Sequence, residues 1–321
     1  MKPKLTRAFV MALLVFIVIY QTAFNMPDKE LPATSAQLGE LLFNDKILSG
    51  DNTVSCASCH KPQFAFADTV ARSEGVNGNL TGRNTPTAMY LEKNTVLFWD
   101  GRAGSLEQQA SGPITNEHEM NLSIKQAVKK LNANMYYLSS FKKIYGRQAD
   151  STLLVRSIAD FERTLSYYDA PYDRFLKGDE NAMNASAIRG FELFHRKNSC
   201  GNSACHNGTS FFSDSMVNIG IFNETDKGLF DRTKNPADIG RFKSPTLRNI
   251  ELTAPYMHDG QHKTLREVID YYNDMKNFPY EGNTHPDVKE QRDHPLNEQE
   301  INDIIEFLKA LTDYRLKPKK A

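Results

Sequence analysis

The chain has 321 residues and carries 39 lysines and arginines against 39 aspartates and glutamates, so its formal net charge at pH 7 is zero. This balance argues against binding to nucleic acid or to an anionic surface through bulk charge, and we expect no nucleic-acid partner. The ~290 residues that follow the N-terminal segment are enough for two domains, each with its own core.

Residues 1–29 have the layout of an export signal. Lys2, Lys4 and Arg7 precede an apolar run from Ala8 to Ile19, which is shorter than the ~20 residues of a usual membrane span. No clean A-x-A cleavage site follows, so a cleaved signal and an uncleaved N-terminal anchor are both open. In either case we expect the folded part to begin near residue 30 and to lie in the periplasm.

The first chemical motif is CASCH, formed by Cys56, Cys59 and His60. In a C-x-x-C-H segment each thiolate can form a thioether with a haem vinyl group, and the adjoining imidazole becomes an axial iron ligand. At this composition roughly 0.001 matches are expected by chance. The segment therefore predicts a covalently attached c-type haem.

A second segment, CGNSACH, contains Cys200, Cys205 and His206, with four residues between its cysteines. All four cysteines of the chain fall in these two motifs, which leaves none for a structural disulfide. The alternative is a redox-active cysteine pair or a zinc site, but zinc needs four ligands that this sequence does not offer at zinc spacing. We therefore predict a second c-type haem.

Sequence strings recur around the two motifs. GELLF (39–43) and GFELF (190–194) lead to them, NTPT (84–87) matches KSPT (243–246), and FWDG (98–101) matches MHDG (257–260). The interval from the proline to the aspartate is the same in both copies. Ser105 and Thr264 then follow at the same offset as candidate helix N-caps. Two copies of one haem-binding unit are the simplest architecture.

Regular structure is predicted to be mainly helical. Apolar residues recur every three or four positions in 123–138, 153–165, 265–272 and 297–311, whereas the alternation typical of strands is scarce. Residues 170–187, with Pro171 and Gly178, are the expected linker. The predicted fold is mainly α, with two cytochrome c-like haem domains related by internal duplication, over 30–170 and 171–321.

The repeat also predicts how the two irons differ. Tyr272 lies thirteen residues after Asp259, and the equivalent position after Asp100 is Pro113, which has no ligating atom. If the copies superpose, the second iron is capped by a side chain and the first is open. An open iron suits peroxide and a capped one suits electron transfer. An insertion after Asp100 would shift this comparison.

With these features the chain resembles the bacterial dihaem cytochrome c peroxidase family, which includes the MauG-type dihaem enzymes. The resemblance runs from about Leu38 to the C-terminal helix. Besides CASCH it rests on GRNTPT (82–87), FWDGRAGSLEQQASGPI (98–114), NEHEM (116–120), FERTL (161–165), SPTLRNIELTAPYMHDG (244–260) and TLREVIDYY (264–272).

The resemblance implies an N-terminal peroxidatic haem and a C-terminal haem that takes electrons from a small cytochrome c or cupredoxin. Glu119 would be the acid/base that moves a proton between the two peroxide oxygens. Gln109 would orient the peroxide by hydrogen bonding, and Trp99 would lie between the haems on the electron path. A lone tryptophan is usually a core residue and a loop glutamate is usually solvated, so these roles depend on the family strings. His118 is expected at the surface or in a supporting position.

The resemblance further implies a calcium ion between the domains, held by the side chain of Asn84 and the backbone carbonyls of Thr253 and Pro255. Few protein ligands with several waters suit this oxygen-seeking ion. Alternatively, Asn84 only caps the turn before Thr85.

Two departures from the family pattern stand out. Many members carry a distal histidine on the loop after the first motif, but this chain has no histidine between His60 and Trp99. We therefore expect a first haem that is open in the oxidised state. Tyr272 stands where typical peroxidases have methionine, which is the MauG-like choice and would lower the potential. Met275 and Tyr271 remain alternative ligands.

Three functions follow from these features. The leading one is reduction of hydrogen peroxide to two waters with two electrons from a small redox protein. The second is a MauG-like oxidase that uses peroxide to modify a partner protein. The third is a dihaem electron carrier without catalysis, which Glu119, Gln109 and Pro113 argue against. The sequence leaves a homodimer open.

Overall fold

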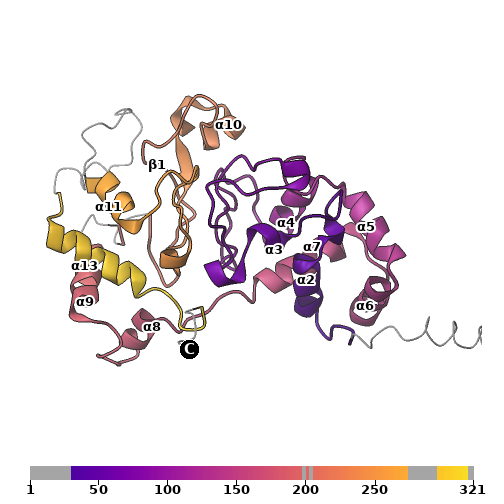
Figure 1. Cartoon of the computed structure of the whole chain (residues 1–321), viewed down its shortest axis with the longest axis horizontal. Coiled ribbons are helices and arrows are strands. Elements are labelled where there is room, and N and C mark those ends of the chain that lie inside the picture. The colour runs from indigo at the N-terminus through magenta and orange to yellow at the C-terminus, as the bar shows by residue number, and fades with distance from the viewer. Residues whose placement is uncertain (1–29, 197–199, 202–204, 274–294, 317–321) are drawn as a thin grey trace, which may run out of the picture.

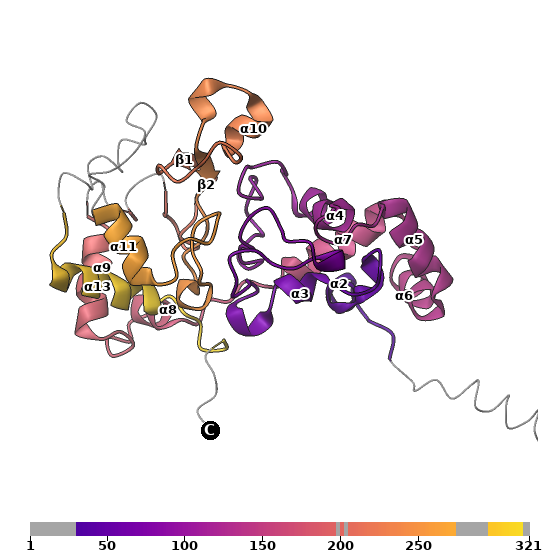
Figure 2. The same cartoon turned by 45° about the horizontal axis from the view of Figure 1, so that its top comes forward.

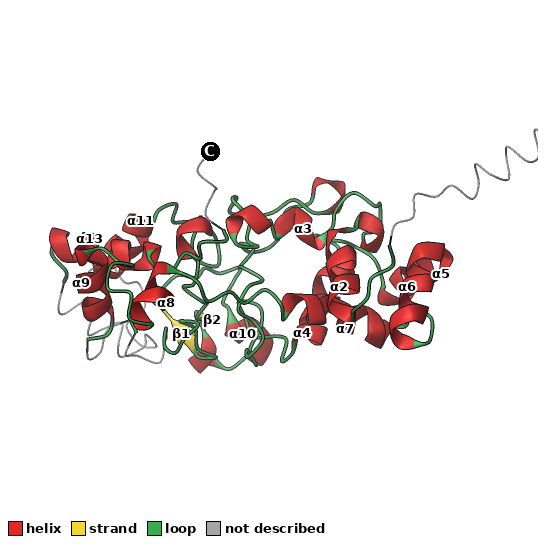
Figure 3. Cartoon of the chain, turned by 90° about the horizontal axis from the view of Figure 1, so that it is seen from below, coloured by secondary structure: helices red, strands yellow, loops and turns green. Residues whose placement is uncertain are grey.

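The computed structural model describes residues 30–196, 200–201, 205–273 and 295–316, so the expected export segment 1–29 and Met275 lie outside the described residues. Within these ranges the chain is mainly helical, as predicted (Figures 1 and 3). None of the described helices is long and apolar enough to span a membrane.

The elements follow one another as α-helices, short 3-10 turns and one small sheet. The α-helices are α2 (Ser35–Asn44), α3 (Cys56–Cys59), α4 (Leu106–Thr115), α5 (Ile124–Ala133), α6 (Met135–Tyr145), α7 (Ser151–Glu162), α8 (Pro171–Leu176), α9 (Ala185–Phe194), α10 (Leu229–Thr233), α11 (Leu265–Asn273) and α13 (Glu298–Lys309). The 3-10 turns are η1 (Lys46–Leu48), η2 (Pro62–Phe64), η3 (Val76–Gly78), η4 (Pro236–Asp238) and η5 (Ile250–Leu252). Strands β1 (Met216–Asn218) and β2 (Arg241–Lys243) pair antiparallel.

Two helix pairs organise two hydrophobic cores. Helix α2 packs on α7, and α9 packs on α13. Figures 1 and 2 show the elements up to α7 gathered on one side of the molecule, and α8, α9, α11 and α13 on the other. The first core includes Leu42 and Phe141, and the second includes Phe211 and Phe307.

Glycines set the close approach within each pair. A Cβ added at Gly39 would lie 1.8 Å from the carbonyl oxygen of Ser157, and one at Gly190 would lie 1.9 Å from that of Asp303. Only glycine leaves room for these backbones to touch. The strings GELLF and GFELF therefore lie within α2 and α9, and the glycine of each string faces the partner helix.

Capping decides where the helices begin and end. Ser105 and Thr264 accept hydrogen bonds from the backbone N–H groups of Gln108 and Glu267, as expected of N-caps. The single helix expected over 123–138 is instead two. Asn134 adopts an extended backbone, and its side chain accepts bonds that begin α6, so a capping side chain ends one helix and starts the next.

The stretch 170–187 also differs from the expected linker. It contains α8 and the start of α9, because Pro171 stands at the first turn of α8, where a proline is tolerated. Tyr172 lies in the second core, and its N–H donates to the carbonyl of Ala310. These residues therefore form part of the packed structure around α9 and α13.

Local contacts around the first motif recur around the second. The Oγ1 of Thr87 donates to the carbonyl of Ala65, and that of Thr246 donates to the carbonyl of Ser210. Phe98 and Met257 both have a positive φ, at 63° and 72°. A bridge joins Leu97 to Ala103, and another joins Tyr256 to His262. The matching strings thus adopt matching conformations.

Candidate haem sites and their surroundings

The first motif lies on a single helical turn. Cys56 and Cys59 bound α3, and His60 is its C-cap residue. The Nδ1 of His60 is 2.9 Å from the carbonyl oxygen of Phe66. Such a contact fixes the ring and makes Nε2 the nitrogen left for a metal. Burial lowers the pKa of His60, so the imidazole is neutral, as an iron ligand must be.

The second motif repeats this arrangement. The Nδ1 of His206 lies 3.2 Å from the carbonyl oxygen of Phe211, and burial lowers the pKa of His206 to about 4. His206 and Cys200 line a cavity of about 150 Å3. Cys205 is the residue before His206, and no described cysteine forms a disulfide. The structure therefore places a neutral imidazole and a thiol at the wall of one cavity.

The thiols do not fit the alternative chemistries. Burial raises the pKa of both Cys59 and Cys200 to about 11, so neither is a reactive thiolate at neutral pH. Among residues 30–196, 200–201, 205–273 and 295–316 there is no group of three or more His, Cys, Asp or Glu that could hold a metal ion. Thioether attachment of haem fits these residues better than a redox pair or zinc.

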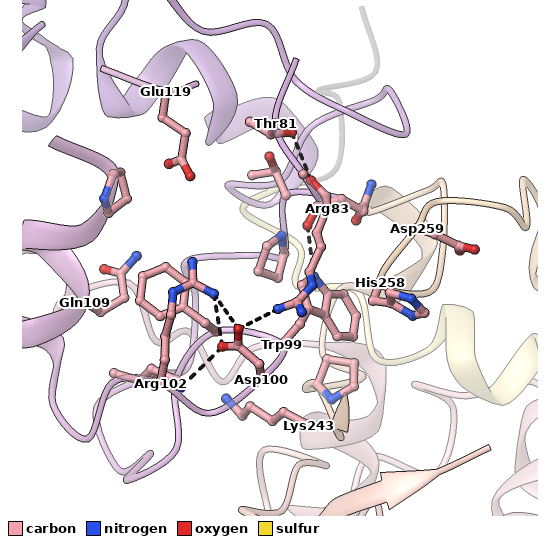
Figure 4. A pocket seen from close by; sticks show the side chains of 18 of the residues that line it. Thr81, Arg83, Trp99, Asp100, Arg102, Gln109, Glu119, Lys243, His258 and Asp259 are labelled. Atoms are coloured by element: carbon pink, nitrogen blue, oxygen red, sulfur yellow. Dashed lines mark hydrogen bonds and ion pairs between the residues drawn. The ribbon is translucent and has the colours of Figure 1, made fainter. Parts of the chain in front are cut away.

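A larger cavity of about 530 Å3 adjoins His60. Its wall brings together the residues predicted for the peroxidatic site, Gln109, Pro113 and Glu119. Figure 4 shows the side chains of Glu119 and Gln109 facing the same space. The Oε1 of Gln109 is buried and has no hydrogen-bond partner among the described residues. A buried orphan acceptor in a cavity beside an imidazole fits a bound haem and its ligand.

Glu119 is half-buried and held in place. The Nδ2 of Asn116 donates to its Oε1 at 2.7 Å. Burial raises the pKa of Glu119, against the lowering effects of Asn116 and the more distant Arg102. A carboxyl whose pKa is raised takes up a proton more readily than an exposed one, which suits an acid/base. His118, in contrast, has a side chain that is 57% exposed, which matches its expected surface position.

Trp99 lies between the two cavities, because it lines both of them. Its indole N–H donates to the carbonyl of Asn84 at 2.9 Å, and its own carbonyl accepts from the N–H of Lys243 at 2.8 Å. These bonds tie the tryptophan to segments from both motif regions.

Tyr272 lines the second cavity together with His206 and Cys200. Burial is the main cause that raises the pKa of its phenol. The hydroxyl of Tyr271 donates to the carbonyl of Ile219 and is thereby engaged elsewhere. Of these two tyrosines, Tyr272 lines the second cavity and Tyr271 does not.

Asn84, Thr253 and Pro255, the residues predicted to hold calcium, all line the second cavity. The Nδ2 of Asn84 donates to the carbonyl of Val70 at 3.1 Å, which leaves its Oδ1 as the candidate ligand atom. The backbone N–H of Asn84 donates to the carbonyl of His258. The three residues are thus brought together from distant parts of the sequence.

An ionic network beside Trp99 was not predicted. Arg83 pairs with Asp100 and with Asp226, both at 2.8 Å. His258 stacks on Phe242, with ring centroids 3.7 Å apart (Figure 4 shows His258 beside Trp99 and Arg83). The repeat could have pointed to His258, because this residue occupies in MHDG the position that Trp99 occupies in FWDG.

Two cavities, each lined by the histidine of a haem-attachment motif, are typical of dihaem c-type cytochromes. A family model described as "Di-haem cytochrome c peroxidase" matches residues 33–181. Methylamine utilization protein MauG of Methylorubrum extorquens is 38% identical over 279 residues, which cover 85% of this chain and 77% of the relative. Cytochrome c551 peroxidase of Nitrosomonas europaea is 36% identical over 286 residues, covering 87% and 80%. The chain belongs to the dihaem cytochrome c peroxidase family.

Two solved structures have a similar fold. A MauG-like protein associated with microbial copper homeostasis superposes with a TM-score of 0.78 at 29% identity, covering 92% of this chain and 97% of that one. The dihaem peroxidase BthA of Burkholderia thailandensis superposes with a TM-score of 0.75 at 22% identity, covering 88% and 86%, which shows the fold alone.

Proposed function

We propose that this chain is an exported dihaem peroxidase that reduces hydrogen peroxide to water with electrons from a small redox protein. The asymmetry of the two cavities carries this proposal. The first brings Gln109, Pro113 and Glu119 to the wall that His60 shares, and Pro113 stands at the repeat position that Tyr272 occupies in the second half. The second presents Tyr272, whose phenol can cap an iron.

Each residue of the first cavity has its own role in the reaction. When bound, the haem supplies the iron at which peroxide is reduced. Glu119 takes the proton from one peroxide oxygen and gives it to the other, so that the leaving oxygen departs as water. Asn116 holds this carboxyl through a hydrogen bond of 2.7 Å. The unpartnered Oε1 of Gln109 accepts a hydrogen bond from the peroxide and orients it.

The second haem, held by Cys200, Cys205 and His206, would supply the redox centre that accepts electrons from a small cytochrome c or cupredoxin. Trp99 is the relay between the sites, which its position at the walls of both cavities supports. Tyr272 would hold the second haem through its phenol oxygen, which its place in the cavity wall with His206 supports. An oxygen ligand there stabilises the oxidised iron.

The wider assignments belong to the same proposal. Domains over 30–170 and 171–321 arose by internal duplication, which the recurring contacts of Thr87 and Thr246 support. Calcium is held by Asn84 with the carbonyls of Thr253 and Pro255, and residues 1–29 direct the protein to the periplasm.

A MauG-like oxidase that uses peroxide to modify a partner protein is the second candidate. Two observations favour it: Tyr272 stands beside the second motif, and no histidine occurs between His60 and Trp99. Both features describe the redox poise of the haems and do not identify a protein substrate.

Steady-state peroxide consumption with a reduced cytochrome c tests the proposal. We expect Glu119→Gln to lower kcat by about 10²–10⁴-fold while both haems remain attached, because the proton transfer is lost. Glu117→Gln is the matched control, since the Glu117 side chain is 80% exposed. Equal turnover by wild type and Glu119→Gln would remove Glu119 from the mechanism. Peroxide-dependent oxidation of a protein without oxidation of the cytochrome would favour the second candidate.

A further inference from the structure

Glu162 is a buried carboxyl that the mechanism above does not use. It is the last residue of α7 and is only 4% exposed. Its Oε2 makes no hydrogen bond with any described residue. It lines the cavity wall together with His60, Gln109 and Glu119. A buried polar oxygen without a partner is costly to keep and is rare in folded proteins, so its retention at this wall calls for a functional reason.

The charged groups around Glu162 do not neutralise it. Arg163 is adjacent in sequence, but its guanidinium pairs with Glu107 at 2.6 Å and with Asp160 at 2.9 Å near the surface. On the cavity side lies Cys56, which carries no positive charge. Burial raises the pKa of Glu162 to about 8, with Arg163 acting in the opposite direction and Glu107 in the same direction. The carboxyl therefore keeps its proton to a higher pH than an exposed glutamate does.

The internal repeat identifies the counterpart of this residue. A Cβ added at Gly39 would lie 2.9 Å from the Cβ of Phe161, and one at Gly190 would lie 2.9 Å from the Cβ of Phe307. The two phenylalanines therefore occupy equivalent positions on α7 and α13. The residues that follow them are Glu162 and Leu308.

The first half of the chain has a carboxyl, Glu162, where the second half has an apolar side chain, Leu308. Leu308 is 5% exposed and lines the second cavity, as Glu162 lines the first. A polar residue is likewise matched by an apolar one at Gln109 and Val268. These two residues follow Asp100 and Asp259 at the same distance in sequence, and they line the first and the second cavity. Both polar groups thus belong to the cavity assigned to chemistry, and both apolar counterparts belong to the cavity assigned to electron transfer.

We propose that Glu162 is a second acid of the first cavity, which holds one of the protons consumed in peroxide reduction and passes it through a bound water to the reacting oxygen. The role rests on the proposed function. Hydrogen peroxide, two electrons and two protons give two waters, and the oxygen–oxygen bond breaks. Glu119 moves a proton that the peroxide already carries. The two protons consumed come from solvent, and Glu162 delivers one of them and is reprotonated from solvent, while the donor protein supplies the electrons.

Three variants of the holoenzyme test the role. Glu162→Gln keeps the shape but has no acidic proton, and Glu162→Leu installs the residue found at the equivalent position of the second half. Glu107→Gln is the control, because Glu107 pairs with Arg163 at the surface. We expect Glu162→Gln and Glu162→Leu to lower kcat with reduced cytochrome c by at least about tenfold, with KM for peroxide little changed. The control should stay within about twofold of wild type.

Infrared difference spectra of the same proteins give a readout that is independent of turnover. A protonated buried carboxyl has a C=O stretching band that shifts in D2O, and this band should be present in wild type and Glu107→Gln and absent in Glu162→Gln. Cyanide affinity of the first haem should be unchanged in Glu162→Gln, which shows that the cavity is intact.

Three outcomes overturn the role of Glu162. They are wild-type turnover in Glu162→Gln and Glu162→Leu with both haems attached, persistence of the infrared band in Glu162→Gln, and loss of cyanide binding in parallel with loss of rate. Failure of the wild type to consume peroxide would refute the proposed function, and with it the delivery of protons to peroxide. In that case the infrared band alone would still show whether Glu162 holds a proton.

Discussion

Replacing Arg248 with methionine should destabilise the protein strongly. Arg248 is 2% exposed, its Nη1 donates to the Oδ2 of Asp173 at 2.7 Å, and its Nε donates to the carbonyl of Thr209 at 2.8 Å. Methionine fills much of the volume but leaves the carboxylate of Asp173 buried without a cation. Removing one partner of a buried pair typically costs about 3–5 kcal/mol. Asp173 still accepts the N–H of Ala170 at 2.8 Å, so we expect about 3 kcal/mol.

Equilibrium unfolding of the holoprotein in guanidinium chloride at pH 7 measures this loss. Arg174→Met is the matched control, since Arg174 and Asp169 form a pair at 2.9 Å whose side chains are 44% and 42% exposed. Such a surface pair contributes about 0–1 kcal/mol. Adding Asp173→Asn to Arg248→Met should restore part of the loss, because the stranded charge is removed. A loss for Arg248→Met no larger than that for Arg174→Met would show that the buried pair contributes no more than a surface pair.

Three further predictions concern packing, ligation and pH. Gly39→Ala should lower the free energy of unfolding by about 1–3 kcal/mol, because the added Cβ would lie 1.8 Å from the carbonyl oxygen of Ser157. Gly82→Ala is the control and should change this free energy little, since a Cβ added there would meet no atom within 4 Å. Tyr272→Phe should alter the absorption spectrum of the second haem and open it to cyanide, and an unchanged spectrum would exclude Tyr272 as the ligand. Burial raises the pKa of Glu162 from 4.5 to about 8, so the protein should lose stability as pH rises between these values. Glu162→Gln should flatten that slope in pH-dependent unfolding, and an unchanged slope would contradict the shift.

Much of the architecture could be predicted because its signals are local. A C-x-x-C-H segment needs only one helical turn to bring Cys56, Cys59 and His60 to one side. The caps Ser105 and Thr264 act within three residues, so sequence spacing alone placed the helices that follow them. The mainly helical fold and the helix at 265–272 were confirmed for the same reason.

The sequence-based predictions were wrong where one local pattern is compatible with more than one structure. Apolar periodicity continues through Asn134, and nothing in that periodicity says that its side chain will begin a new helix. Likewise, Pro171 and Gly178 are typical of a linker. The burial of Tyr172 against the second core, however, gives α8 a packed position.

The order of residues by itself determined the covalent haem chemistry, the repeat and the identity of the groups available at each site, because these follow from residue type and short spacing. The tertiary structure alone decided which of those groups share a cavity and which are cut off from water. In the sequence, Glu162 is one residue of the string FERTL and has no assigned role. The structure shows that its Oε2 is buried without a hydrogen-bond partner among the described residues and that the residue lines the cavity. Burial and a shared cavity are consequences of packing, which places residues more than a hundred positions apart, such as His60 and Glu162, at one cavity wall.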